Sequence, residues 1–131
     1  MRNLLLVSLL ALSACATASL GSRFDGRELV AEAVNDVPAT GTRAPTLRLE
    51  NGRATGSAGC NSFSASYKLD GERLEFGPIA STEMACEPAA MEQERSFLSI
   101  LAAVRSYSRY GNGSLSLIAP DGRAIRLRPR T

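Results

Sequence analysis

Residues 59–86 read GCNSFSASYKLDGERLEFGPIASTEMAC, and this stretch decides the fold that we predict. A cysteine lies close to each of its ends. Between them, residues 63–69 alternate apolar and polar side chains, which is typical of a half-buried strand. The pair Asp70-Gly71 then favours a tight turn, and residues 73–76 return as a second strand. The stretch therefore predicts a β-hairpin whose two flanks a disulfide could join.

The same alternation predicts further strands on both sides of this hairpin. They cover residues 46–50, 53–59, 106–110, 114–118 and 123–128. Residues 27–34 could be helix or strand by propensity, and we take them as a strand. The pair Asn51-Gly52 is a strong hairpin signal, because a type I′ turn needs positive φ at both central positions. Short strands joined by tight turns indicate an antiparallel sheet.

One helix is expected at residues 89–104, after Pro88, whose missing N–H costs nothing at the start of a helix. Its apolar residues fall on one stripe at helical spacing. They are Met91, Phe97, Leu98, Leu101 and Val104. A single helix covering one sheet face predicts an α+β fold, in which a small curved antiparallel sheet, open-barrel-like, packs on the helix.

The composition argues against several classes of function. The 15 Lys and Arg residues nearly balance the 13 Asp and Glu residues, which argues against a nucleic-acid partner. Histidine is absent, so the chain lacks the commonest general base and the commonest neutral metal ligand. We therefore expect no metal, no cofactor and no catalytic residues.

Residues 1–14 have the character of a signal peptide. Arg2 supplies a short basic region, and residues 4–12 form an apolar run. Such a run is too short to cross a bilayer core, which needs about 20 residues. We expect this segment to be removed after export.

The end of that segment, Leu12-Ser13-Ala14-Cys15, resembles the lipobox of bacterial lipoproteins, whose cysteine is lipidated and becomes the new N-terminus. The alternative is an ordinary signal peptide that leaves Cys15 as a free thiol, a liability in an oxidising compartment. Ala16, rather than Asp, follows the cysteine. By analogy with Gram-negative sorting, this favours the outer membrane, facing the periplasm.

Three segments follow from this interpretation. The signal peptide occupies residues 1–14, and the lipidated cysteine with a flexible tether of small residues occupies 15–24. One folded domain occupies residues 25–131. The membrane is then a partner through the lipid on Cys15.

With Cys15 assigned to the lipid, Cys60 and Cys86 remain, and an oxidising compartment favours a disulfide between them. Closing a loop of this length is worth about 3.5 kcal/mol in the chain-entropy model. A redox pair is the alternative, although no Cys-x-x-Cys spacing is present. A metal site is another, although two thiols without histidine do not complete a tetrahedral shell.

Beyond these separate motifs, the chain resembles the META domain, the HslJ-like group of bacterial proteins. The match runs from about Leu29 to Leu127. The residues that carry it are Gly59, Cys60, Asn61, Tyr67, Leu74, Phe76, Gly77, Pro78, Thr82, Met84, Cys86, Glu94 and Phe97.

The resemblance implies a small β-rich domain with one helix, often found on secreted or lipid-anchored proteins. It also implies a link to heat shock and the stress response, to antibiotic tolerance and to virulence-related motility. No catalytic residues of the family carry over. We expect a non-enzymatic binding module of the envelope. The alternatives are a scaffold or assembly partner of an envelope protein complex, or an enzyme of unknown reaction.

Asn61 and Thr82 stand beside the two cysteines and have two interpretations. They could line a ligand site, or they could satisfy backbone groups at turns and bulges. We expect the structural role, because no base or metal ligand is near them in the sequence. Gly59 and Met84 belong to the same structural motif.

Glu94 lies on the apolar stripe of the expected helix. A carboxylate that faces a core needs hydrogen-bond partners. We expect it to accept a bond from the backbone at residues 60–61 or at Thr82. The alternative is a general acid.

The last predicted strand carries a run of arginines: Arg123, Arg126, Arg128 and Arg130. Because apolar residues alternate with them, we expect a solvated strand face that also blunts an exposed sheet edge. Binding of anionic lipid or polysaccharide is the alternative.

Overall fold

The computed structural model describes residues 19–39 and 43–130. The predicted signal peptide, Cys15 and the first residues of the predicted tether lie outside this part of the chain. The elements in order are β1 Glu28–Val34, β2 Val37–Pro38, β3 Thr46–Glu50, β4 Arg53–Ser57, β5 Ser62–Asp70, β6 Arg73–Phe76, β7 Ala80–Ser81, α1 Pro88–Ala103, β8 Ser106–Arg109, β9 Leu115–Ile118 and β10 Ala124–Pro129. The predicted strands and helix are thus confirmed, with ends that shift by one or two residues.

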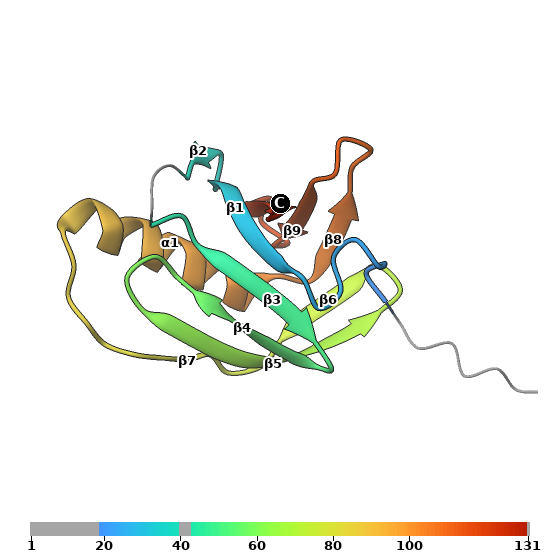
Figure 1. Ribbon diagram of the computed structural model, residues 1–131, viewed down its shortest axis with the longest axis horizontal. Helices are drawn as coiled ribbons and strands as arrows, with labels where there is room; N and C mark the ends of the chain where they lie inside the picture. The colour runs from blue at the N-terminus through green and yellow to red at the C-terminus, as the bar shows by residue number, and fades with distance from the viewer. Residues whose placement is uncertain (1–18, 40–42, 131) are drawn as a thin grey trace, which may run out of the picture.

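The strands of the described residues close into an antiparallel barrel. The order around the ring is β1, β3, β4, β5, β6, β8, β9 and β10, and β10 pairs with β1 to complete it. Figure 1 shows the C-terminal end of the chain beside β1. The short strands β2 and β7 lie outside the ring and pair with β1 and β5. The prediction of an open sheet was therefore wrong, and closure leaves neither β1 nor β10 with a free edge.

Closure depends on a β-bulge in β1. The register against β10 shifts between Ala31 and Ala33, which leaves Glu32 as an extra residue. Because side chains alternate between the two faces of a strand, one extra residue reverses the order of faces beyond it. As a result Ala31 and Val34, three positions apart, both lie in the core.

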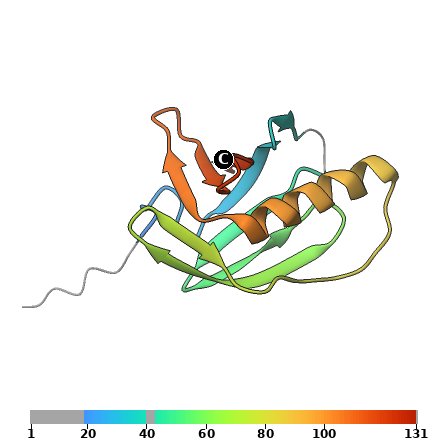
Figure 2. The same cartoon turned by 180° about the vertical axis from the view of Figure 1, so that it is seen from behind.

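Large aliphatic side chains fill the barrel. The fully buried ones from the strands are Leu29, Leu47, Leu49, Leu74, Leu115, Leu117, Ile125 and Leu127. The helix α1 runs across the strands, as Figure 2 shows, and Phe97 packs against Phe63 with ring centroids 5.5 Å apart. The core is therefore mainly aliphatic, and the contact between Phe63 and Phe97 joins the helix to β5.

The buried face of α1 differs slightly from the predicted stripe. It comprises Ala90, Glu94, Phe97, Ile100 and Leu101, and Val104 is buried just after the helix. Met91 and Leu98, which the sequence pattern assigns to the stripe, are only half-buried. The centre of the face follows positions 90, 94, 97, 101 and 104, so these two residues lie on its flanks.

The folded domain begins before the predicted boundary at residue 25. Leu20 is fully buried and Phe24 is 4% exposed, and both belong to the main core. A turn closed by the Phe24 N–H donating to the Gly21 carbonyl, 2.9 Å away, brings the two side chains inward. Arg109 of β8 donates to the carbonyl of Leu20 at 3.1 Å. The interpretation of residues 20–24 as tether was therefore wrong.

This packing generates a stability prediction. Leu20→Ala should lower the free energy of unfolding by about 2 kcal/mol, because it removes a buried side chain and leaves a cavity. The measurement is urea denaturation followed by circular dichroism. Ser22→Ala, an exposed change in the same turn, is the control and should unfold within about 0.5 kcal/mol of the wild type. Equal midpoints for the two variants would contradict the placement of Leu20 in the core.

Candidate functional site

Two glycines meet steric requirements in this region, Gly56 within β4 and Gly59 in the turn that leads into β5. A side chain on Gly56 would put its Cβ 2.1 Å from the Thr46 carbonyl oxygen of β3, so the two strands approach closely there. Gly59 has φ of 119°, a conformation that residues with a side chain rarely adopt. The Ala58 N–H donates to the Asn61 carbonyl at 2.7 Å and closes the turn. This turn places Asn61 in the interior, where it is 2% exposed.

Glu94 reaches this turn from the buried face of α1. One carboxylate oxygen accepts a hydrogen bond from the Asn61 backbone N–H at 2.6 Å, and the other accepts one from Asn61 Nδ2 at 2.7 Å. Glu94 is 5% exposed, so these charge-assisted bonds replace the water that it loses. Of the two expected partners, the backbone at residues 60–61 and that of Thr82, the structure therefore places Glu94 on the first.

The other side of Asn61 holds the segment that enters the helix. We call residues 82–87 the strap. Asn61 Oδ1 accepts hydrogen bonds from the Met84 N–H at 2.6 Å and from the Thr82 hydroxyl at 2.9 Å. Asn61 Nδ2 also donates to the Met84 carbonyl at 3.1 Å. The asparagine side chain thus pairs with the backbone of Met84 as a neighbouring strand residue would.

Thr82 completes the network. Its hydroxyl accepts from the Ser62 N–H at 3.2 Å, and its own N–H donates to the Ser62 carbonyl at 3.0 Å. Gly59, Asn61, Thr82, Met84 and Glu94, which the sequence identifies as one motif, are therefore brought together. Their contacts satisfy backbone groups, which agrees with the structural role expected for them.

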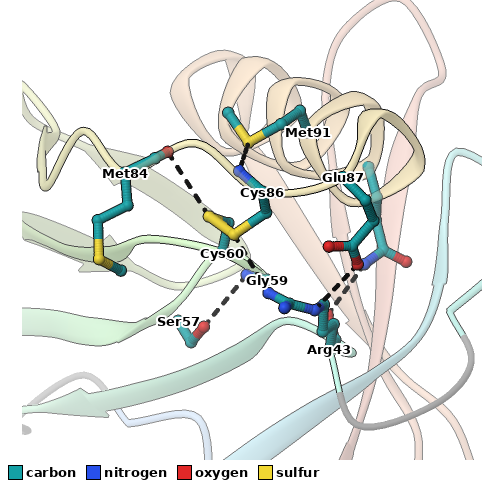
Figure 3. A network of polar contacts seen from close by, with 9 residues as sticks. Arg43, Ser57, Gly59, Cys60, Met84, Cys86, Glu87 and Met91 are labelled. Atoms are coloured by element: carbon teal, nitrogen blue, oxygen red, sulfur yellow. Dashed lines mark hydrogen bonds and ion pairs between the residues drawn. A yellow bond between two sulfur atoms is a disulfide. The ribbon is translucent and has the colours of Figure 1, made fainter.

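The disulfide between Cys60 and Cys86 is present, with Cα atoms 6.1 Å apart. Figure 3 shows that it joins the β4–β5 turn to the strap, beside the start of α1. Arg43 Nη1 lies 3.2 Å from Cys86 Sγ, and Arg43 Nε lies 3.0 Å from a Glu87 carboxylate oxygen. The Cys86 N–H donates to the Met91 sulfur at 3.4 Å.

The arginines of the last strand are matched by carboxylates. Glu32, the bulge residue, pairs with Arg128 at 2.7 Å and with Arg126 at 3.5 Å. Arg130 lies 3.1 Å from Glu28. These pairs cross the seam between β1 and β10, on the outer surface of the barrel. The solvated face is confirmed, whereas the expected sheet edge is wrong, because β10 is paired on both sides.

The remaining arginine of that run, Arg123, caps the turn before β10. Its backbone N–H donates to Asp121 at 3.1 Å, and its guanidinium donates at 2.8 Å. These donors hold the pKa of the Asp121 carboxyl below its usual value, the backbone bond having the largest effect.

The hollows on the surface of the described residues include three of about 400 Å³ or more. One of about 660 Å³ adjoins the Asn51-Gly52 turn, and one of about 410 Å³ lies between β2 and the start of α1. The third, of about 550 Å³, runs between the β6–β7 connection and α1. We call this third hollow the groove; its main apolar lining comes from Phe76, Pro78, Ile79, Leu98 and Ala102. It lies beside the strap, in which Met84 is 57% exposed.

Neither a metal cluster nor a membrane-spanning helix is found in the described part of the chain. Residues 19–39 and 43–130 contain no group of three His, Cys, Asp or Glu side chains placed to hold a metal ion. Over the same ranges, no helix has the length and apolar character needed to span a membrane.

Comparison with known proteins agrees with the fold. A model of the META domain family matches residues 20–131. The chain belongs to the META domain family. The match begins at Leu20, which is the first buried residue in the described part of the chain. A search of curated proteins gives no match.

Two solved structures share the META-domain fold of this chain. One is described as the NMR structure of the protein from Burkholderia xenovorans, with 24% identity, a TM-score of 0.66, and coverage of 82% of this chain and 84% of that chain. The other, described as the NMR structure of the protein, has 23% identity, a TM-score of 0.66, and coverage of 81% and 91%. At these identities the likeness concerns the fold.

Sequence reasoning missed two parts of this region. Arg43 and Glu87 were not linked to the cysteines, because Arg43 belongs to a loop 43 positions before Cys86 and carries no motif of its own. The groove was also missed, since its walls come from β6 and from the flank of α1. The glycine and proline at positions 77–78 gave the only signal, a break between two strands.

The paired contacts of Asn61 and Glu94 predict a coupled effect on stability. Asn61→Asp should cost about 3 kcal/mol at neutral pH, because it sets two carboxylates against each other and removes a donor. Glu94→Gln should cost about 2 kcal/mol, because an amide N–H then faces the Asn61 donors. In the double variant the new amide at position 94 can donate to the new carboxylate at position 61. The loss of stability in the double variant should therefore be at least about 1 kcal/mol smaller than the sum of the losses in the two single variants.

Chemical denaturation of the four proteins in this cycle measures the coupling. Glu92→Gln, which changes an exposed glutamate two residues from Glu94, is the matched control and should change stability by less than about 0.5 kcal/mol. Additive costs in the double variant would show that the two side chains do not act as a pair.

Proposed function

We propose that this META-domain protein is a lipid-anchored module of the Gram-negative envelope, on the periplasmic face of the outer membrane. The motif Leu12-Ser13-Ala14-Cys15 supports lipidation of Cys15, and Ala16 after the cysteine supports sorting to the outer membrane. The disulfide between Cys60 and Cys86 is compatible with an oxidising compartment. Several acyl chains on one cysteine would hold the protein firmly, since a single chain binds membranes only marginally.

The early start of the barrel supports a position close to the membrane. Four residues separate Cys15 from Leu20, which is fully buried. Even a fully extended chain of this length reaches only about 17 Å, at about 3.5 Å per residue. An anchored domain would therefore stay beside the lipid headgroups, within reach of partners in the same membrane.

We infer a non-enzymatic binding role, and the groove beside α1 is the observation that carries it. Five apolar side chains line it, together with Ser81 of β7 and Ser99 of α1. Among the described strands, β7 pairs with β5 alone, which leaves its other edge available. A free strand edge next to an apolar groove suits an extended peptide that adds one strand and places alternate side chains in the groove. The proposed ligand is an extended segment of another envelope protein.

A role as scaffold or assembly partner of an envelope complex uses the same surface. The scaffold role and the binding role differ in how long the complex with the partner lasts. The packed barrel interior gives less support to a buried small ligand, because large leucine side chains occupy it.

The anchor has a direct test. Cys15→Ala should release the protein from the membrane fraction, because no acyl chain can be attached. Fractionation with detection of an epitope at the C-terminus measures this, and Ser13→Ala, which keeps the cysteine, is the control. Continued membrane association of Cys15→Ala would exclude the lipid anchor.

The groove is tested by site-specific photocrosslinking in cells. A crosslinking residue at Ala102 should capture a discrete protein, whereas the same residue at Lys68, exposed on β5 outside the groove, should not. Leu98→Glu should abolish the Ala102 product by placing a charge in the groove. Arg95→Ala, exposed on the same helix, should preserve it. Capture that survives Leu98→Glu would refute binding in the groove.

A further inference from the structure

The two sulfurs of the disulfide lie in opposite electrostatic surroundings. Cys86 Sγ lies 3.2 Å from Nη1 of the positively charged Arg43 guanidinium. Cys60 Sγ lies 3.6 Å from the Met84 carbonyl oxygen, the negative end of a peptide dipole (Figure 3). A cation favours a thiolate, and a carbonyl oxygen disfavours one but accepts a bond from a neutral thiol. Negative charge is therefore stabilised on Cys86 and destabilised on Cys60.

Glu87 is the charged group that shares Arg43 with the sulfur. It takes the Nε side of the guanidinium at 3.0 Å, which leaves Nη1 directed at Cys86. Gln93 Nε2 donates to the Arg43 carbonyl at 3.0 Å and holds the backbone of this residue against α1. The guanidinium is thus held in place, and the two cysteines and Arg43 remain at least partly exposed to solvent.

The positions of both cysteines are also fixed without the bond between them. Cys60 precedes Asn61, which Glu94 binds at 2.6 Å and 2.7 Å. Cys86 follows Met84 by two residues, and Asn61 binds both backbone groups of Met84. Breaking the disulfide therefore leaves the turn joined to α1 by buried hydrogen bonds and to the strap by partly buried ones. The two sulfurs stay close enough for the bond to form again.

From these observations we propose that the Cys60–Cys86 disulfide is a site of reversible thiol–disulfide exchange with an external dithiol, in which Cys60 is attacked and Cys86 leaves. This inference does not depend on the proposed anchor or on the groove. It assigns Arg43 as the residue that stabilises the leaving thiolate.

The exchange has two balanced steps. A thiolate of the external dithiol attacks Cys60 Sγ, a new S–S bond forms, and the electron pair of the old bond remains on Cys86 beside Arg43. The second thiolate of the dithiol then attacks its own sulfur in the mixed disulfide and displaces Cys60, which takes up a proton. The dithiol loses two electrons and the protein disulfide gains them. The folded product carries two reduced cysteines, with Cys86 beside Arg43.

Glutathione, a monothiol, can trap the first step in the full chain carrying Cys15→Ser, which leaves two cysteines. The oxidised protein is treated briefly with glutathione, quenched in acid, alkylated and mapped by mass spectrometry. Glutathione should be found on Cys60 and the alkyl group on Cys86, in a ratio of at least about five to one. Equal labelling, or glutathione mainly on Cys86, would overturn the proposal.

The reduction rate provides the second test. Arg43→Gln should slow reduction about fivefold, because the leaving thiolate loses its cation. Arg105→Gln is the matched control: Arg105 is 45% exposed and pairs with Glu75, whereas Arg43 is 46% exposed and pairs with Glu87. The control should be reduced at the wild-type rate, and equal rates for the two variants would exclude the role of Arg43.

Two further measurements separate exchange on the folded protein from reduction after unfolding. The rate should rise in proportion to glutathione concentration, and the reduced protein should still melt cooperatively. A rate that levels off at a limit set by opening of the chain would overturn the proposal, as would a reduced protein that is unfolded at room temperature.

Discussion

The fold depends on one buried contact, in which the carboxylate of Glu94 accepts two hydrogen bonds from Asn61. Taking a carboxylate out of water costs several kcal/mol, and only well-placed donors offset that cost. The pair is therefore stable only when α1 lies at one position and the β4–β5 turn has one shape. Because the same asparagine binds both backbone groups of Met84, the contact also fixes the strap that connects the barrel to the helix. A single side chain thus sets the relation between three segments that are distant in the sequence.

The barrel depends on a second constraint, the bulge at Glu32 in β1. Without the extra residue, Val34 would face solvent and the register with β10 would not bring the buried side chains of both strands inward. The bulge also directs the Glu32 carboxylate outward to Arg126 and Arg128. One residue therefore both keeps the core continuous across the seam and neutralises part of the charge on the last strand. The arginines are accounted for by these pairs, which weakens the case for a site that binds anionic polymers.

The sequence predicts what depends on neighbouring residues and fails where distant segments meet. Alternation in residues 63–69 and the Asn51-Gly52 turn are local patterns, so the strands and hairpins were found from them. Closure of the barrel could not be found from such patterns, because β10 has the same alternation whether or not β1 pairs with it. Leu20 was missed since a lone apolar residue among small ones has no period, and only its contacts show that it is core. Glu94 was recognised because a charge on an apolar stripe needs a partner, and residues 60–61 were one of the two partners that its place in the motif suggested.

The disulfide and the hydrogen-bond network both join the β4–β5 turn to the strap. The bonds between Asn61 and Glu94 are made between buried groups, and those between Asn61 and Met84 are partly buried. A disulfide adds stability mainly by restricting the unfolded chain, and the folded state need not depend on it. Because non-covalent contacts already position both cysteines, the folded state does not need the disulfide. The reactivity of the disulfide then depends on the groups around each sulfur. Those surroundings differ between the two sulfurs because Arg43 contacts only one of them. The disulfide that the sequence favours over a redox pair therefore has, in three dimensions, the difference between its two sulfurs that an exchange reaction requires.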